Sequence, residues 1–180
     1  MNSTTPGYRS IRNEKNPVRS FGPIADRTAR ILILGSMPGA ESLRAGQYYA
    51  HPRNAFWPIM EMLLHDGSTL SYTRRVKLLK QSRIALWDVL HSCIRAGSLD
   101  VNIRREFLVP NDFSEFLERH PLITQVYFNG AKAEEYFRKH ALPQLNPDRF
   151  SLQRLPSTSP AHASLTFQQK LGAWKVITGS

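Results

Sequence analysis

The chain has 180 residues and a formal net charge of +10. A chain of this length is expected to fold as one domain with a core of its own. Its single cysteine, Cys93, excludes an internal disulfide, and it excludes a cysteine-ligated zinc or iron–sulfur site within one chain. The basic balance favours a polyanionic partner, with nucleic acid as the leading class.

The N-terminal segment differs in composition from the rest of the chain. Residues 1–20 are polar, rich in Asn, Ser, Arg and Pro, and carry few apolar anchors. We therefore expect a flexible basic arm over 1–20, followed by one domain over 21–180. The segment lacks the apolar core of a secretory signal, and no apolar run reaches membrane-spanning length. We expect a cytoplasmic protein without a membrane partner, associated with the nucleoid in a prokaryote.

Apolar patterning predicts strands that alternate with helices. This alternation indicates an α/β fold with a parallel sheet and helices on both of its faces. The basic stretch 91–105 has no such pattern and is expected to be irregular, whereas Thr166 and Gln169 fit a capping box at the start of the last helix. The expected strands are 31–34, 84–90, 123–128 and 150–155, and the expected helices are 54–67 (capped by Asn54), 72–81, 111–120, 131–141 and 166–178.

Polar and small residues follow each predicted strand. Open α/β sheets bind their ligands at the carboxyl ends of the strands, so these residues are expected to meet at one site. Backbone N–H groups after Gly35 can hold an anion, and tyrosines can stack on a base. Taken singly, each residue also fits a structural role as a turn, a cap or a rim group, and only the shared position favours a site. The segments concerned are Gly35–Gly39 with Tyr48–Asn54, then Asp88, Asn129–Gly130 and Ser157–Ala161.

Four motifs between residues 31 and 164 resemble those of the uracil-DNA glycosylase superfamily, and in particular its hypoxanthine (deoxyinosine) DNA glycosylase branch. They are LILGSMPGAESLRAGQYYAHPRNAFW, IALWDVLHSCIRAGSLDVNI, VYFNGAKA and LPSTSPAHAS. The resemblance implies a three-layer α/β/α sandwich around a four-stranded parallel sheet. It also implies a monofunctional enzyme that flips a deaminated base out of double- or single-stranded DNA and hydrolyses its N-glycosidic bond. No metal or other cofactor is implied, and we expect a monomer.

The resemblance also suggests which residues carry the chemistry. Many relatives have Asn or Asp where this chain has Met37, and they use it to position the attacking water. A thioether cannot do this, so we expect Asn54, the nearest amide of the same motif, to replace it. Asp88 matches the strand end where other branches keep an Asn that reads the base, and it is the second expected catalytic residue.

The remaining predicted contacts fall into two groups. Base contacts are expected from the first motif, from one tyrosine that matches a stacking aromatic, and from the end of the third strand. DNA contacts are expected from the YYAHPRN segment and from the loop after the fourth strand, where Ser157 stands in place of a family His. The base-contacting residues are Gly35, Ser36, Met37, Tyr49 and Asn129, and the DNA-contacting residues are His51, Arg53, Ser157, Thr158, Ser159, Pro160 and Ala161.

Two other functions fit the same residues. Met37, in place of the usual amide, suits a non-catalytic protein that binds DNA or lesions on the same fold. A hydrolase of free nucleosides could use the same strand ends, although the net charge of +10 argues against it. The motifs do not rank hypoxanthine, uracil and xanthine as the excised base.

Overall fold

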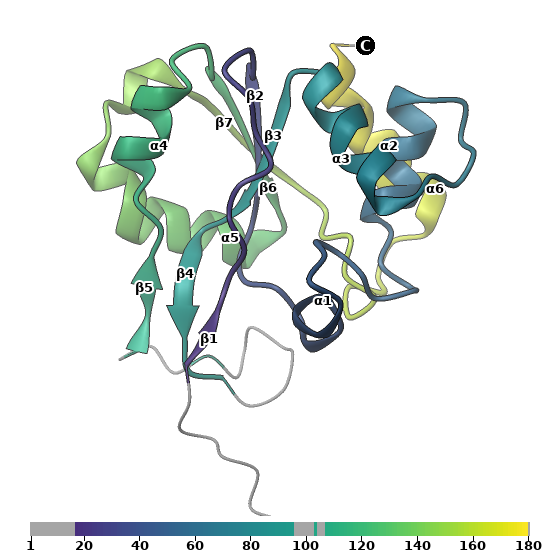
Figure 1. Cartoon of the computed structure of the whole chain (residues 1–180), viewed down its shortest axis with the longest axis horizontal. Helices are drawn as coiled ribbons and strands as arrows, with labels where there is room; N and C mark the ends of the chain where they lie inside the picture. Colours follow the sequence, from purple (N-terminus) through teal and green to yellow (C-terminus); the bar gives the residue numbers. More distant parts are fainter. Residues whose placement is uncertain (1–16, 96–102, 104–106, 180) are drawn as a thin grey trace, which may run out of the picture.

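A four-stranded parallel sheet lies at the centre of the computed structural model, which describes residues 17–95, 103 and 107–179 (Figure 1). The strand order is β3-β2-β6-β7. The neighbouring strands β3 and β2 are almost entirely buried, as expected for strands covered on both faces. The strands are β2 (Ile31–Gly35), β3 (Ile84–Asp88), β6 (Gln125–Asn129) and β7 (Ser151–Leu155).

The register of this sheet brings the predicted site residues together. Gly35 lies opposite Asp88 in the parallel β2–β3 pair, and Asn129 lies opposite Leu155 in the β6–β7 pair. All four strands therefore end at one edge of the sheet.

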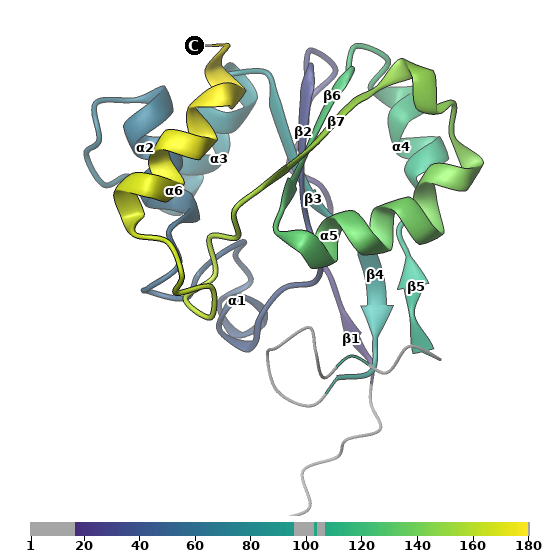
Figure 2. The same cartoon turned by 180° about the vertical axis from the view of Figure 1, so that it is seen from behind.

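Helices cover both faces of the sheet, which confirms the predicted three-layer α/β/α sandwich (Figure 1 and Figure 2). Each face has its own hydrophobic cluster. One is centred on Phe56, Trp57 and Trp174, and the other on Phe113 and Phe137. On the first face lie α2 (Phe56–Leu64), α3 (Tyr72–Gln81) and α6 (Phe167–Trp174), and on the second lie α4 (Phe113–Arg119) and α5 (Ala131–Tyr136).

Short helical segments extend or join these helices. A π-helix continues α5, so that the two together span the predicted helix 131–141. The predicted capping box is present, since the Thr166 side chain accepts from the Gln169 N–H and the Gln169 side chain accepts from the Thr166 N–H. The short segments are the π-helix η3 (Phe137–Ala141) and the 3₁₀ helices η4 (Leu142–Gln144), η5 (Pro147–Arg149) and η6 (Lys175–Thr178).

A second, antiparallel sheet was not predicted. Its order is β1-β4-β5. The strands are β1 (Val18–Arg19), β4 (Leu90–Cys93) and β5 (Val109–Pro110). The expectation that 91–105 is irregular is therefore wrong for 91–93, and β3 ends two residues before the predicted end at 90. Strands of two to four residues are too short to show a period in the sequence.

This second sheet also changes the picture of the N-terminal segment. Val18 pairs with Cys93 and Arg19 pairs with Ser92, so the end of the expected arm is part of a sheet. The rest of that predicted arm, residues 1–16, lies outside the described residues.

One helix near the site was expected to be a loop. α1 (Ala40–Ala45) follows the Pro38-Gly39 pair and ends at Gly46, whose φ of 63° is left-handed. Six residues with a glycine at each end give too little apolar periodicity to predict a helix. α2, in turn, begins at Phe56, and its N-cap is Ala55. The prediction that Asn54 is the N-cap is therefore wrong by one residue, because Asn54 precedes the cap.

Candidate active site

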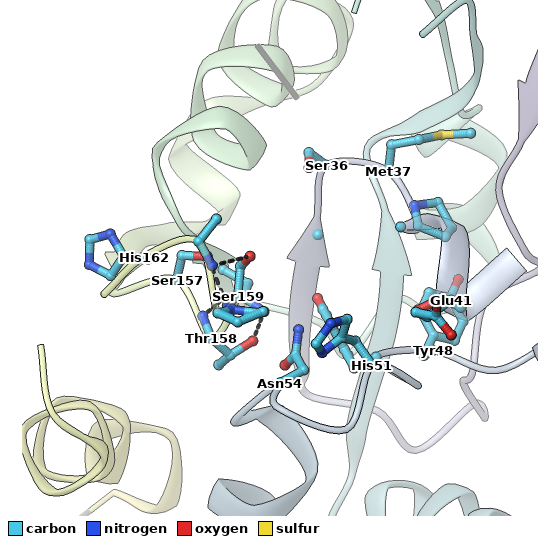
Figure 3. Close-up of a pocket in the computed structure, with 18 of the residues that line it drawn as sticks. Ser36, Met37, Glu41, Tyr48, His51, Asn54, Ser157, Thr158, Ser159 and His162 are labelled. Atoms are coloured by element: carbon cyan, nitrogen blue, oxygen red, sulfur yellow. Dashed lines mark hydrogen bonds between the residues drawn. The ribbon is translucent and has the colours of Figure 1, made fainter. Parts of the chain in front are cut away.

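The carboxyl ends of the parallel strands border a cavity of about 870 Å³ (Figure 3). The structure places every residue of the predicted site in its lining, although these residues come from four separate segments of the chain. Their individual roles remain predictions. The residues are Gly35, Ser36, Met37, Tyr49, His51, Arg53, Asn54, Asp88, Asn129, Ser157, Thr158, Ser159, Pro160 and Ala161.

The floor of the cavity is the end of β2, where Gly35 permits a close approach. A Cβ atom on Gly35 would lie 2.4 Å from Asp88 Oδ1 and 2.9 Å from the Tyr49 hydroxyl oxygen. Only a glycine fits there, and its absent side chain lets a carboxylate and a phenol converge on one point. The Asp88 residue is only 3% exposed, and its backbone carbonyl accepts a hydrogen bond of 2.8 Å from Asn111 Nδ2.

One wall of the cavity is formed by residues 48–54, which we call the tyrosine loop. Tyr49 stacks on Phe56, with ring centroids 4.2 Å apart and an interplanar angle of 29°. Its neighbour Tyr48 is buried, and burial, followed by the negative charge of Asp88, raises the pKa of the Tyr48 hydroxyl. Tyr48 is therefore a neutral phenol at physiological pH, and it donates a hydrogen bond of 3.1 Å to the Gly22 carbonyl.

The end of the tyrosine loop presents an amide and an imidazole. Asn54 Oδ1 accepts a hydrogen bond of 3.0 Å from the N–H of Phe56, the first residue of α2. His51 Nδ1 lies 3.1 Å from the backbone nitrogen of Arg53 and accepts its N–H. In the neutral ring the proton therefore sits on Nε2, which leaves His51 a donor on its other side.

The opposite wall is formed by residues 156–162, which we call the serine loop. Its buried centre is Thr158, which is 0% exposed. The Thr158 N–H donates to Asn129 Oδ1 at 2.8 Å, and Asn129 Nδ2 donates to Thr158 Oγ1 at 2.9 Å. The Thr158 carbonyl accepts from the Ala55 N–H at 3.0 Å, which joins the two loops. The side-chain bonds of Asn129 go to the serine loop, and its predicted contact with the base stays a prediction.

Gly130 allows the serine loop to approach β6. It has the positive φ that the Asn-Gly turn predicts, 96°, and a Cβ on it would lie 2.9 Å from the Cβ of Ser157. Within the loop, Ser157 Oγ accepts from the Ser159 N–H and Ser159 Oγ accepts from the Ala161 N–H, each at 3.2 Å.

Two side chains of α6 donate hydrogen bonds to backbone carbonyls of the serine loop. Trp174 Nε1 donates to the Pro156 carbonyl at 2.9 Å. Lys170 Nζ lies 2.7 Å from the His162 carbonyl oxygen and 3.5 Å from that of Ser159, and it donates to both. Lys170 is only 6% exposed, and burial lowers the pKa of its ammonium group. This cation therefore orders the loop from inside and is not placed to contact a phosphate.

Comparison with known proteins identifies the family. The model of the uracil DNA glycosylase superfamily matches residues 21–177. The chain belongs to this superfamily. The predicted family and the predicted enzyme class, a DNA glycosylase, are thereby confirmed.

Two proteins from archaeal species are similar to this chain over most of its length. The chain is 36% identical over 160 residues to the hypoxanthine DNA glycosylase of Methanosarcina acetivorans, covering 88% of this chain and 96% of that protein. It is 40% identical over 119 residues to the hypoxanthine DNA glycosylase of Methanosarcina barkeri, covering 66% and 74%. The solution NMR structure of a Methanosarcina acetivorans protein, provisionally assigned as a uracil DNA glycosylase, matches with a TM-score of 0.72, 34% identity and coverage of 91% and 99%.

Basic residues that the sequence did not single out also line the glycosylase cavity. Lys132 is the second residue of α5, and its Nζ lies 2.6 Å from a Glu135 carboxylate oxygen. His162 belongs to the LPSTSPAHAS motif but was not chosen as a site residue. Lys132 lies two residues after the Asn129-Gly130 turn, and this closeness to a predicted strand end could have identified it. Together with the exposed Arg53, these two residues add positive or polar donors to the lining of the cavity.

Within residues 17–95, 103 and 107–179, no group of three or more His, Cys, Asp or Glu side chains is placed to hold a metal ion. None of the helices in the described part of the chain is long and apolar enough to cross a membrane.

Proposed function

We propose that this protein removes hypoxanthine from DNA by hydrolysis of the N-glycosidic bond, as a step of base excision repair. The observation that carries the proposal is the convergence of the Asp88 carboxylate and the Tyr49 hydroxyl on Gly35 at the floor of the cavity. The names of the two Methanosarcina relatives support hypoxanthine as the base.

The floor suits the hydrogen-bonding edge of hypoxanthine. This base offers N1–H as a donor and O6 as an acceptor. An ionised Asp88 accepts from N1–H, and Ser36 or a neighbouring backbone N–H donates to O6. Adenine has an unprotonated N1 and an amino group at C6, so both partners would be left unpaired in the buried site. Uracil and xanthine present a similar C=O and N–H pair and are expected as weaker substrates.

The walls suit the remaining parts of the substrate. The flipped base stacks on the Tyr49 face that is turned away from Phe56. Asn54 orients the attacking water, because an amide oxygen that accepts from the Phe56 N–H with one lone pair can accept from water with the other. Backbone N–H groups at Gly35–Met37 stabilise the negative charge that develops on the departing base.

The serine loop and the basic rim take the DNA backbone. Ser157–Ala161 carry small side chains, which lets a phosphate backbone approach closely, and the loop fills the gap left by the flipped nucleotide. Arg53 and His51 donate to phosphates on the opposite side. We propose that the protein acts as a monomer on double- or single-stranded DNA in the cytoplasm, at the nucleoid in a prokaryote.

A glycosylase assay tests this function. Duplexes with one inosine, uracil or xanthine opposite each normal base, and the corresponding single strands, are incubated with the protein in EDTA and then treated with alkali. We expect strand breaks first in inosine-containing DNA. Strand breaks only in uracil-containing DNA would show that uracil, and not hypoxanthine, is the excised base. Tight binding without breaks would favour a non-catalytic lesion binder, the function that Met37 suggests, and release of hypoxanthine from free deoxyinosine without a preference for DNA would indicate a nucleoside hydrolase.

A further inference from the structure

The backbone of Tyr49 adopts a conformation that L-residues rarely take. Its φ is +52°, and Arg83 is the only other non-glycine residue with a positive φ in the described part of the chain. Such a conformation persists where the surrounding structure holds it, and it is concentrated at functional sites. Because φ sets the direction of the Cα–Cβ bond, the stacking of Tyr49 on Phe56 depends on this conformation.

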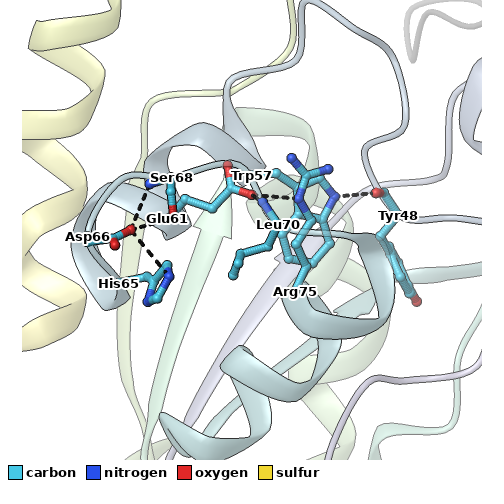
Figure 4. Close-up of polar contacts among 8 residues, drawn as sticks. All are labelled: Tyr48, Trp57, Glu61, His65, Asp66, Ser68, Leu70 and Arg75. Carbon is cyan, nitrogen blue, oxygen red and sulfur yellow. Dashed lines mark hydrogen bonds and ion pairs between the residues drawn. The ribbon is translucent and has the colours of Figure 1, made fainter.

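The preceding residue is fixed at both of its backbone polar groups. The indole Nε1 of Trp57 donates to the Tyr48 carbonyl at 2.7 Å (Figure 4). The Tyr48 N–H donates to the hydroxyl oxygen of Tyr72 at 3.1 Å. The Tyr48 carbonyl belongs to the peptide unit that leads into Tyr49, so the bond from Trp57 orients the plane from which the φ of Tyr49 is measured. The bond to Tyr72 holds the peptide unit before it and so fixes the position of Tyr48.

An ion pair between the buried Glu61 and the partly buried Arg75 in turn packs against Trp57. The Arg75 guanidinium lies 5.5 Å from the centroid of the Trp57 ring. Arg75 Nε donates to Glu61 Oε1 at 2.8 Å, and the same oxygen accepts from the Leu70 N–H at 2.8 Å (Figure 4). Glu61 is only 2% exposed, and a buried carboxylate needs these partners.

We propose that Trp57 and Tyr72, supported by the Glu61–Arg75 ion pair, are positioning residues for the base-stacking tyrosine. The inference rests on the proposed function, since it gives Tyr49 a base to stack on. None of these four residues lines the cavity, so they act on the substrate through Tyr48 and Tyr49. In this arrangement a buried network on the α2–α3 side stabilises the left-handed conformation of Tyr49 before the base arrives.

The variant Tyr72→Phe isolates this effect, because it removes one hydroxyl and keeps the ring that packs edge-on against Trp57. Single-turnover excision of hypoxanthine is measured for wild type, Tyr72→Phe, Tyr49→Ala and the double variant. The loss of one hydrogen bond predicts a fall of about 3- to 10-fold in the excision rate of Tyr72→Phe. In the Tyr49→Ala background, Tyr72→Phe should cause no further loss.

Tyr127→Phe is the matched control. Tyr127 belongs to the same hydrophobic cluster, is 6% exposed and does not line the cavity. This control should excise at the wild-type rate. Equal losses from Tyr72→Phe in both backgrounds would overturn the proposal, because they would show a general structural role. An unchanged excision rate in Tyr72→Phe would overturn it as well.

A second readout does not depend on activity. Crystal structures of Tyr72→Phe and Trp57→Phe should show residue 49 displaced from the left-handed region or its ring displaced from Phe56. Retention of both features in both variants would overturn the positioning role, whatever the enzyme excises. Absence of excision by the wild-type protein on every duplex would instead count against the proposed function.

Discussion

The two walls of the cavity are built on different principles. The tyrosine loop presents large side chains. It is supported by the aromatic rings of Trp57 and Tyr72 and by the Glu61–Arg75 ion pair. The serine loop presents small side chains and is held from below through its backbone carbonyls, by Lys170 and Trp174. The walls meet where the Ala55 N–H donates to the Thr158 carbonyl.

This difference separates two tasks of a glycosylase. Rigid aromatic and amide side chains suit the base and the attacking water, whose positions must be set accurately in the transition state. A loop with small side chains and an ordered backbone suits phosphates and a gapped duplex. We therefore expect substitutions of Tyr49 and Asn54 in the first wall to change the rate of bond cleavage, and substitutions in the second wall to change the affinity for DNA.

The largest expected effect comes from Asn54→Ala. Loss of the group that orients water should lower the single-turnover excision rate by about 10²–10⁴-fold, a range typical for the loss of a positioned catalytic group, with little change in the affinity for product DNA. The same change also removes the hydrogen bond to the Phe56 N–H, which costs about 1 kcal/mol of stability. Asn54→Ser is the control, because a serine hydroxyl can still accept from this N–H but reaches less far. A rapid Asn54→Ser enzyme would contradict the assigned role.

The next effect is expected at the floor, from Gly35→Ala. The new methyl group would overlap Asp88 Oδ1, so either the carboxylate or the end of β2 must move. We expect about a 100-fold loss of excision, since small displacements of reacting groups have effects of this order, and a loss of about 1–3 kcal/mol in the free energy of unfolding.

Gly172→Ala is the matched control for this glycine. Gly172 lies within α6, and a Cβ there meets no atom within 4 Å. Alanine in a helix should stabilise the protein by about 0.5–1 kcal/mol and leave excision unchanged. Full activity of Gly35→Ala would mean that Asp88 does not need its present position.

A smaller effect, on binding, is expected from Asn129→Ala. Thr158 loses both of its bonds to the amide, which loosens the serine loop, and the dissociation constant for abasic-site DNA should rise about tenfold. At saturating enzyme the excision rate should change little. If Asn129 instead reads the base, as the sequence suggested, the rate at saturation will fall and the affinity for abasic DNA will stay unchanged.

The smallest effect is expected from Lys170→Met. Removal of the buried cation should weaken DNA binding a few-fold without changing how steeply binding falls with salt, because Lys170 does not reach the phosphates. Arg53→Ala is the comparison, since an exposed phosphate contact should lower the slope of log K against log salt by about 0.9. A lower slope in Lys170→Met would place this lysine on the DNA instead of under the loop.

Much of the framework could be predicted from the sequence. The apolar run Ile31–Leu34 followed by Gly35 identified a buried strand and its end, and the other strand ends followed from the same rule. Because parallel strands share one carboxyl edge, the cavity lining could be anticipated without any knowledge of contacts.

The remaining features depend on tertiary contacts that leave no local pattern. Strands of two residues, such as Val18–Arg19, have no period to read. The partner of Asn129 lies 29 residues away, and nothing in the Asn-Gly turn indicates that its amide holds Thr158. Tyr48 and Tyr49 look alike in the sequence and both line the cavity. Tyr48 is buried and bonded to Gly22, Trp57 and Tyr72, whereas Tyr49 has a left-handed backbone.

The most direct test is the release of free base from a duplex with a single inosine, measured by mass spectrometry with enzyme in excess and EDTA present. We predict one hypoxanthine per duplex from the wild-type protein and, from Asn54→Ser, release slower by about two orders of magnitude or more with DNA binding intact. Tight binding of the duplex by the wild-type protein without any free hypoxanthine would contradict this account and would make the protein a lesion binder.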